Sequence, residues 1–284
     1  MTTRRTLLTA FLGVGLSGAY LIPPFADAHN HGIGTGDEKR DRSMIARYLR
    51  AGVFYMQSMG NMPLTRADRD RLGLDALDGV DAALAQGSFS GPGGHPMGLM
   101  RNVLLPQGYF PGYTIETLKG VRFYEVGSEQ DLQAKWPKLR AAQGDLIKFI
   151  LFNSDEYDAR KDNSAFFGRR GLDPKIAPLI VRMAHRDGLR AAAHVVDVAD
   201  FRVALDAGVD IIAHLPMEGM LTEQDGRRTA AKLLICASSV SSAMPSCCRC
   251  GPATRREQSF RSGRSALCRR VTKPASWRSN AGTR

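Results

Sequence analysis

The residues with the clearest chemical potential are His29 and His31, which close a short apolar run over residues 25–32. Side chains alternate between the two faces of an extended strand, so both histidines would point the same way and could reach one metal ion. Neutral imidazole is a ligand for zinc and neighbouring divalent metals. Asp27 lies on the same face, where it could order a histidine or bind the metal itself. The pair alone is also compatible with two ordinary surface histidines.

Two further histidines end apolar segments downstream. The segments 189–194 and 209–214 finish on His194 and His214, and a helix is predicted between them over residues 197–208. Strand, helix and strand at this spacing are typical of right-handed βαβ units in a parallel sheet. The two histidines are therefore predicted to occupy equivalent ends of neighbouring strands.

A lysine lies in the middle of another apolar segment, which spans residues 145–152. Continuous apolar runs of this length are typical of parallel strands covered on both faces. Burying a charged amine in such a strand costs free energy, so the presence of Lys148 there has to be explained by a role of its side chain. A lysine with a lowered pKa can react with CO2, and the carbamate that forms is an anionic ligand with two oxygens, able to bridge two cations. The alternative is a structural lysine that points outward or pairs with a carboxylate.

A glycine-rich loop is predicted over residues 87–96, after a short strand at 81–86. Loops that follow barrel strands are where sites are built, so His95 in this loop could contact a substrate, although it could equally have no role.

The remaining elements are predicted from hydrophobic period and helix-end signals. Residues 97–127 show no clean period, so they are expected to form a long connection or an inserted lobe, and Pro137 is expected to kink or split its helix. The other predictions are a strand at 52–57 and helices at 39–49, 65–77, 128–143 and 173–188.

These strand-end residues predict the fold class. The carboxyl ends of the strands of a (β/α)8 barrel form one rim where active sites are built, so residues far apart in the chain meet there. Four of the chain's six histidines lie in or at the end of such strands. We therefore predict an α/β fold of the (β/α)8 TIM-barrel type over residues 21–232, incomplete because nothing after residue 232 resembles the last strands and helices.

In these residues the chain resembles the amidohydrolase superfamily, in its two-metal, imidazolonepropionase-like and prolidase-like branch. The resemblance runs from about Pro23 to about Lys232. It rests on the ordered set Asp27-Ala28-His29-Asn30-His31, Gly93-Gly94-His95-Pro96, Ile147-Lys148-Phe149, His194 and the stretch from Asp206 to His214.

The resemblance implies a metal-dependent amidohydrolase that cleaves an amide-type or related C–N bond of a small molecule with a metal-activated water. It implies two divalent metal ions, expected to be zinc. His29 and His31 would bind the first, His194 and His214 the second, and Lys148, as a carbamate, would bridge them.

One departure weakens this reading. The general base of the family is an aspartate that ends strand 8, and no aspartate follows Asp225 in this sequence. The alternative is a catalytically inactive remnant or metal-binding pseudoenzyme. A phosphoesterase or nuclease on a similar barrel is less favoured, because the metal-binding glutamate common in such enzymes cannot be placed.

The positive charge of the chain is concentrated in its last 52 residues. The whole chain has 39 Lys and Arg against 28 Asp and Glu, for a net charge of +11. Residues 233–284 hold ten basic residues and one acid, Glu257, or +9, so residues 1–232 hold 29 basic and 27 acidic residues, or +2. The body therefore lacks the charge typical of a nucleic-acid partner.

Residues 233–284 also hold ten serines, nine arginines and all five cysteines. A seventh strand could be read in residues 233–240, but the rest shows no sustained period. We predict an irregular tail produced by a shift of the coding frame near Lys232, with a truncation by other means as a second explanation. A metal-binding or nucleic-acid-binding extension is the alternative, although the Cys247-Cys248-Arg249-Cys250 cluster lacks the spaced pairs of a structural zinc site.

Residues 1–20 have the character of an export signal, with Arg4-Arg5 before an uncharged run and Ser17-Gly18-Ala19 as a cleavage site. Export to the periplasm or outside the cell is therefore predicted. The alternatives are an uncleaved membrane anchor and a cytoplasmic protein with an apolar first strand. The sequence makes no prediction of oligomeric state.

Overall fold

The computed structural model describes residues 24–238 of the chain. The predicted export segment and the predicted tail from residue 239 onward lie outside the described residues. Within residues 24–238, none of the helices combines the length and the apolar character needed to cross a bilayer.

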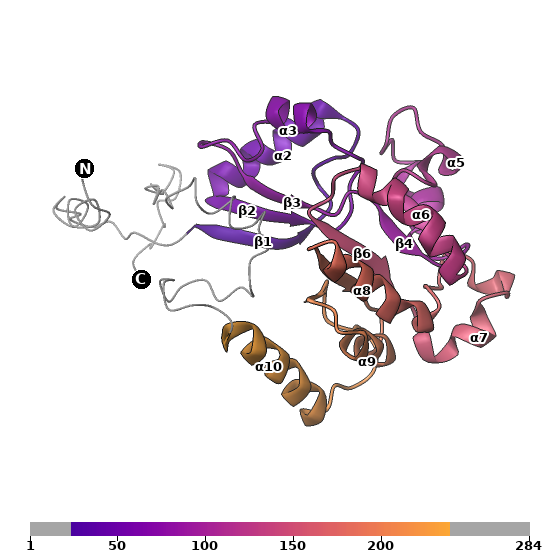
Figure 1. Cartoon of the computed structure of the whole chain (residues 1–284). Coiled ribbons are helices and arrows are strands. Elements are labelled where there is room, and N and C mark those ends of the chain that lie inside the picture. Colours follow the sequence, from indigo (N-terminus) through magenta and orange to yellow (C-terminus); the bar gives the residue numbers. More distant parts are fainter. Residues whose placement is uncertain (1–23, 239–284) are drawn as a thin grey trace, which may run out of the picture.

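The strands run parallel in two sheets (Figure 1). The first sheet has the order β1-β2-β3, and the second has the order β5-β4-β6-β7-β8. Their bounds are β1 Phe25–Asn30, β2 Val53–Ser58, β3 Asp81–Leu84, β4 Ser88–Ser90, β5 Phe123–Glu125, β6 Leu146–Ile150, β7 Arg190–His194 and β8 Ile211–Ile212.

The two sheets continue into one another through β3 and β4. Only residues 85–87 separate these strands, and Gln86 takes a left-handed backbone conformation with φ of 62° at the bend. The Asp145 N–H, at the start of β6, donates to the Leu84 carbonyl at 2.7 Å. Counting β3 and β4 as one strand, β1, β2, β3–β4, β6, β7 and β8 follow one another as six consecutive strands of a (β/α)8 barrel. The fold is therefore α/β of the TIM-barrel type, with six of the eight strands in the described residues.

Helices cover the outer side of this wall (Figure 1), with α2 and α3 along the first sheet and α6 and α8 along the second. The α-helices are α2 Glu38–Ala51, α3 Arg66–Leu72, α4 Met97–Leu99, α5 Ile115–Leu118, α6 Glu129–Ala141, α7 Tyr157–Arg160, α8 Ala177–Arg186, α9 Val198–Ala207 and α10 Glu223–Ser238. A π-helical turn, η1, spans Met100–Leu104, and the 3-10 turns are η2 Ser154–Glu156, η3 Ser164–Phe166 and η4 Pro174–Ile176.

The helix ends follow the predicted capping residues. The Ser128 hydroxyl accepts the Asp131 N–H at 3.1 Å and begins α6, and Asp197 begins α9 in a capping box with Asp200. Helix α6 runs unbroken past Pro137, so of the two effects expected of this proline, a kink or a split, the split does not occur.

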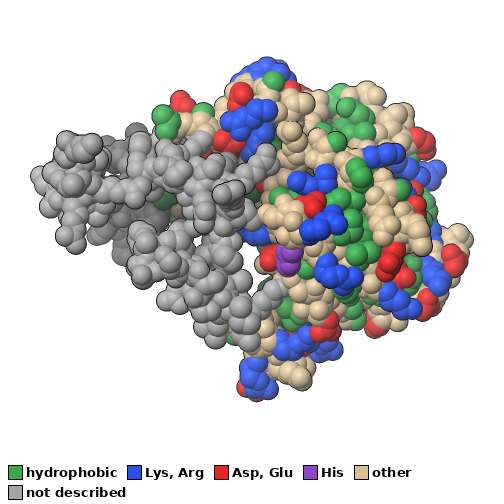
Figure 2. Space-filling model, viewed as in Figure 1, with side chains coloured by type: hydrophobic (Ala, Val, Ile, Leu, Met, Phe, Trp, Pro, Cys, Tyr) green, Lys and Arg blue, Asp and Glu red, His purple; other side chains and the backbone are tan. Residues whose placement is uncertain are grey.

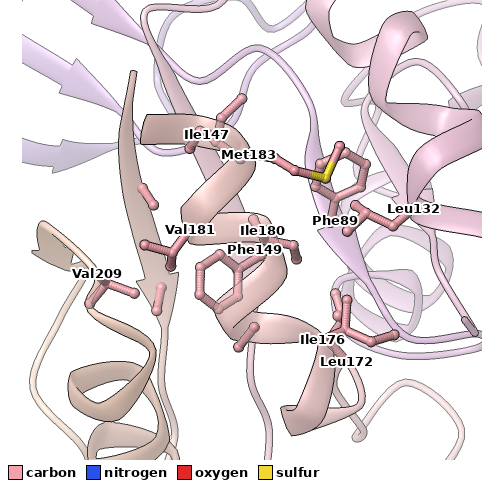
Figure 3. Packing of buried hydrophobic residues seen from close by; sticks show 14 of the residues in the cluster. Phe89, Leu132, Ile147, Phe149, Leu172, Ile176, Ile180, Val181, Met183 and Val209 are labelled. Atoms are coloured by element: carbon pink, nitrogen blue, oxygen red, sulfur yellow. The ribbon is translucent and has the colours of Figure 1, made fainter. Parts of the chain in front are cut away.

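The main core lies between the second sheet and its helices. Phe149 of β6 and Phe89 of β4 are both fully buried there, and Figure 3 shows Phe149 beside Ile180 and Val181 of α8. A smaller interior cluster joins Met59, Ala85, Leu146, Ala192 and Ala213. Leu146 and Ala192 lie in β6 and β7, and the other three directly follow β2, β3 and β8. Because these strands are not all neighbours in the sheet, the cluster lies on the inner side of the barrel wall.

Three predictions at element level need correction. Residues 87–96 are not all loop, because β4 occupies Ser88–Ser90. The strand predicted at 209–214 is reduced to Ile211–Ile212, so His214 lies just beyond a strand end. The possible strand over 233–240 is instead the end of α10, which continues to Ser238, so the predicted irregular tail begins as helix.

The face shown in Figure 2 carries lysines and arginines interspersed with aspartates and glutamates, without a large area of one sign. Charged side chains of the described residues also pair across neighbouring elements, such as Arg71 of α3 with Glu38 of α2 at 3.0 Å. This surface agrees with the near-neutral body that the sequence predicts.

Candidate metal and catalytic site

Strand periodicity directs Lys148 and His194 into the barrel. In β6, Phe149 packs against the helices, whereas Leu146 belongs to the interior cluster together with Ala192 of β7. Side chains two residues apart share a face, so Lys148 follows Leu146 and His194 follows Ala192 into the interior. The register of β6 on β7 pairs Ile150 with His194, which places the histidine at the rim.

The structure brings five of the six histidines together at this rim. The Nε2 atoms of His29 and His31 are 3.1 Å apart, and Nε2 of His214 is 2.8 Å from Nδ1 of His194. The rings of His29 and His214 stack with centroids 5.4 Å apart, and His95 stacks on His194 at 4.8 Å. All the residues predicted to bind metal or substrate therefore converge in one place.

The sixth histidine, His185, lies away from this site on α8. Its Nε2 is 2.8 Å from Oδ2 of Asp210, and its side chain is exposed. It offers a matched control for substitutions in the cluster.

Backbone carbonyls set the orientation of three rings in the cluster. Nδ1 of His29 donates to the Ala213 carbonyl, Nδ1 of His31 to the Gly60 carbonyl at 3.0 Å, and Nδ1 of His214 to the Leu215 carbonyl at 3.3 Å. A carbonyl can only accept, so Nδ1 carries the proton in each ring and Nε2 keeps a free lone pair directed at the other histidines. Hydrogen bonds of this kind fix the tautomer of metal-binding histidines.

Asp27 orders the first strand. Its Oδ1 accepts the His29 N–H at 3.1 Å, and its Oδ2 accepts the Tyr48 hydroxyl of α2 at 2.6 Å. Of the two roles open to Asp27 in the sequence, these contacts favour ordering, because both carboxylate oxygens already have partners.

Burial and neighbouring cations keep the imidazoles neutral. Burial lowers the pKa of His31 to about 4, with a further contribution from the Arg122 guanidinium, and burial and the Lys148 ammonium lower the pKa of His95 to about 4. The pKa values of His29, His194 and His214 are also lowered, in each case mainly by burial. Neutral imidazole is the form that binds a metal.

These pKa values predict how the rings titrate in metal-free protein. We expect His31 and His95 to stay neutral until the pH falls to about 4, because their charged forms are desolvated and face other cations. NMR titration of the ring nitrogens, in protein freed of metal by a chelator, measures this directly. A midpoint near the ordinary histidine value of 6.5 for either ring would contradict the described environment.

Lys148 is the one lysine that the structure buries within this cluster. Its side chain is 2% exposed, and its Nζ makes no hydrogen bond to any described residue. Burial, together with a smaller contribution from the charge of Arg122, lowers the pKa of Lys148 to about 7. A large fraction of the amine is therefore neutral and nucleophilic near pH 7, as carbamate formation requires.

The ring nitrogens of the cluster fit divalent cations, although the described residues do not already form a complete set of metal ligands. Among the described residues, no three His, Cys, Asp or Glu side chains surround a common point, because the ring nitrogens meet in two pairs. Two nitrogen ligands at about 2.0–2.1 Å from one cation are about 2.9–3.4 Å apart for ligand angles of about 90–110°. The observed separations of 3.1 and 2.8 Å lie at or near this range. Each pair could thus hold one cation with little adjustment.

Arg122 is a residue of the site that the sequence did not reveal. It lies one residue before β5, in the segment 97–127 that shows no hydrophobic period, and β5 pairs with β4 beside the cluster. Its side chain is 5% exposed, and its Nη2 donates to the Gly60 carbonyl at 2.6 Å. An isolated arginine in an aperiodic segment gives no local signal of burial.

A hollow of about 420 Å³ opens beside the loop that carries His95. Gly93 of this loop and Met97 of α4 line one part of it, and Phe167 and Arg170 line another, with charged groups of both signs around them. The His95 N–H donates to the Arg170 carbonyl at 2.9 Å, which joins the hollow to the histidine cluster.

The rim loops after β6 and β7 are held together by one buried carboxylate, that of Asp200 at the start of α9. It accepts the Ser154 N–H at 2.9 Å and hydroxyl at 2.5 Å from one loop, and the Val196 N–H at 2.9 Å from the other. A further bond comes from the Asn153 N–H at 3.1 Å. Asp200 therefore positions the backbone on both sides of His194.

Replacing Asp200 by alanine is expected to destabilise the protein by about 3 kcal/mol, since it leaves several buried donors without an acceptor. Asp155→Ala provides the control, because Asp155 is an exposed residue of the same loop. Urea unfolding of both variants measures the difference. Equal midpoints for the two would show that solvent replaces the Asp200 carboxylate at no cost.

The chain was compared with known proteins at the levels of sequence and structure. No protein-family model and no curated protein matches it. Among solved structures, it is similar to A. niger ochratoxinase, with a TM-score of 0.53 and 16% identity over 74% of this chain and 50% of that one. An amidohydrolase matches with a TM-score of 0.53 and 17% identity, covering 78% of this chain and 56% of that one.

A prolidase complexed with N-methylphosphonate-L-proline gives a TM-score of 0.53 and 15% identity, over 76% of this chain and 52% of that one. The chain thus spans about half the length of each of these structures. At these identities the likeness is one of fold. The described residues therefore share the barrel fold of these solved structures, as the sequence predicts.

Proposed function

We propose that this chain carries the metal-binding part of a metal-dependent amidohydrolase, which hydrolyses an amide-type or related C–N bond of a small molecule. One observation carries the proposal: four strand-end histidines converge on a buried lysine whose Nζ has no partner among the described residues. Burying an amine without a carboxylate partner costs free energy of folding, and a function of Lys148 would explain why the chain retains it. The solved structures of similar fold include an amidohydrolase and a prolidase, which supports this reaction class.

His29 and His31 would hold one divalent cation, and His194 and His214 a second, with Lys148 between them. Bound cations, which we propose to be zinc, would polarise the scissile carbonyl and lower the pKa of the attacking water. The neutral Lys148 amine would add to CO2 and release one proton, and the resulting carbamate would supply an anionic ligand for the cations. The carbonyls of Ala213, Gly60 and Leu215 hold the three Nδ1–H groups, which keeps each Nε2 directed at the site.

The hollow beside His95 is the proposed place where the substrate is bound. Arg170 would meet a carboxylate, the ion pair of Lys119 with Glu125 at 3.4 Å offers further charge of both signs, and Phe167 offers an apolar surface. This mixture suits a small polar substrate with an acyl group, such as an N-acyl amino acid or a dipeptide. His95 would then contact the substrate from the loop between the hollow and the cations.

The second candidate is a protein that binds metal without hydrolysis. It is favoured by the absence of an aspartate after Asp225, since an aspartate serves as the general base in the family that the sequence resembles. The two candidates share the metal site and differ only in turnover.

The test combines metal content with hydrolysis. We expect the full chain, dialysed against buffered zinc, to retain close to two zinc ions per chain by elemental analysis, and the double variant His29→Asn/His31→Asn to lose about one. A panel of N-acyl amino acids and dipeptides then separates the candidates, because zinc-dependent product formation supports the hydrolase and tight zinc without turnover supports the second candidate. No zinc retained by the folded chain would refute both.

A further inference from the structure

Arg122 enters the histidine cluster from an insertion in the barrel. Strand β5 adds to the free side of β4, with Ser88 opposite Phe123, while Ser88 is also opposite Lys148 on the other side. Arg122, next to Phe123, is thus carried to the rim close to the end of β2. The guanidinium is buried there, with 5% of the side chain exposed.

The guanidinium and the ring of His31 share one acceptor. Nη2 of Arg122 donates to the Gly60 carbonyl at 2.6 Å, and Nδ1 of His31 donates to the same carbonyl at 3.0 Å. The two donor nitrogens are 3.5 Å apart, as expected for two groups that meet on one oxygen. The position of the Gly60 carbonyl therefore couples the guanidinium to the orientation of His31.

The glycine at position 60 leaves the space that this contact requires. A Cβ at Gly60 would lie 2.3 Å from Nη1 of Arg122, and the backbone φ of 145° disfavours other residues. Glycine lets the guanidinium pack directly against the peptide group whose carbonyl it holds.

The charge of Arg122 has no counter-ion among the described residues. No aspartate or glutamate forms an ion pair with it there, and its buried Nε makes no hydrogen bond to a described residue. The titratable groups that face it are Lys148, His31 and His95, all of them bases that cannot neutralise its charge. A buried guanidinium among basic groups is costly unless an anion joins it.

We propose that Arg122 is a positioning residue with two roles: it fixes the ring of His31 through the Gly60 carbonyl, and its buried charge balances an anionic ligand formed at Lys148. The second role rests on the proposed function, because the anion is the Lys148 carbamate. Direct binding of a substrate carboxylate is less favoured, since the side chain is almost completely buried. A hydrogen bond to the Gly60 carbonyl does not by itself explain an arginine here, because a neutral donor would make this bond without burying a charge.

The test uses Arg122→Gln and Arg122→Lys, with Arg101→Gln as control for an exposed arginine. Glutamine keeps a donor for the Gly60 carbonyl and removes the charge, whereas lysine keeps the charge and loses the planar fork. Thermal unfolding of the metal-free proteins shows first which variants fold. If Arg122→Gln does not fold, Arg122→Lys still tests the His31 role.

The first readout needs no metal. Nitrogen NMR of the ring reports the His31 tautomer, and we expect the Nδ1–H form to dominate in the wild-type chain and in Arg101→Gln. Arg122→Lys should show a measurable fraction of the other tautomer, because a single ammonium holds the Gly60 carbonyl less firmly. Unchanged His31 signals in this variant would overturn the first role.

The second readout is zinc affinity by chelator competition, in the presence and absence of bicarbonate. Losing a partner around the metal ligands typically costs about 10–100-fold in metal affinity. We expect a loss of this size for Arg122→Gln with bicarbonate and a substantial recovery in Arg122→Lys. Equal bicarbonate-dependent affinity in the wild type and Arg122→Gln would overturn the charge-balancing role. A wild-type chain that binds no zinc would refute the proposed function and this second role, while the NMR result would still decide the first.

Discussion

Replacing His194 by asparagine is expected to lower zinc-dependent hydrolysis more than about 100-fold. Losing a residue that only hydrogen-bonds to a metal ligand costs about 10–100-fold, and this change removes a proposed ligand itself. Nδ1 of His194 is 2.8 Å from Nε2 of His214, so its loss would leave the proposed second cation with one ring. Asparagine fills part of the space without an equivalent nitrogen ligand. Initial rates at several zinc concentrations measure the effect, and added zinc should restore part of the activity.

His185→Asn is the matched control for this prediction. His185 contacts Asp210 on the outer side of the barrel and makes no contact with the cluster. Its replacement should leave both rate and zinc dependence near those of the wild type. Similar losses in the two variants would mean that the effect of His194→Asn comes from general instability.

Lys148→Met is expected to abolish hydrolysis while making the metal-free protein more stable near neutral pH. Methionine has a similar length and no charge, so it removes the desolvation cost of an amine that is 2% exposed. It also removes the carbamate that we propose to bridge the cations. Activity with and without bicarbonate, together with urea unfolding of metal-free protein, measures the two effects.

The pH dependence of the free energy of unfolding measures the contribution of Lys148 separately. Its pKa falls from 10.5 to about 7 on folding, so the unfolded chain binds the proton more tightly between these values. The free energy of unfolding should therefore rise with pH from about 7 to about 10.5, by at most about 1.4 kcal/mol per pH unit from this group. In carbonate-free buffer, the difference between the wild type and Lys148→Met should grow smaller across this window. A constant difference would show that the Lys148 amine titrates normally and is not desolvated.

The strand-end residues could be predicted from sequence because short periods control them. In a parallel strand, the apolar run and the two-residue alternation decide both burial and direction, so Lys148, His194 and the pair His29 and His31 were placed correctly at one rim. His214 was also placed there, although the strand before it is only two residues long. These placements depend on the local hydrophobic pattern and on the rule that the carboxyl ends of barrel strands form one rim.

The contacts that complete the site could not be predicted in this way. Arg122 reaches the cluster because β5 adds to β4 across the sheet, and neither strand has a clear pattern in its three residues. The apolar residues from Leu233 onward fit a short strand or a buried helix equally well by period, and the structure continues α10 through them. Contacts between segments far apart in the chain decide such cases, and the residue pattern of a single sequence does not specify these contacts.

The most direct measurement is a crystal structure of the zinc-loaded chain with anomalous scattering recorded at the zinc edge. The account predicts two peaks about 3.5–4 Å apart at the carboxyl ends of the strands, one beside His29 and His31 and one beside His194 and His214, with density extending from Lys148 between them. Zinc bound elsewhere, or a Lys148 side chain that remains an unmodified amine while both peaks are present, would contradict it.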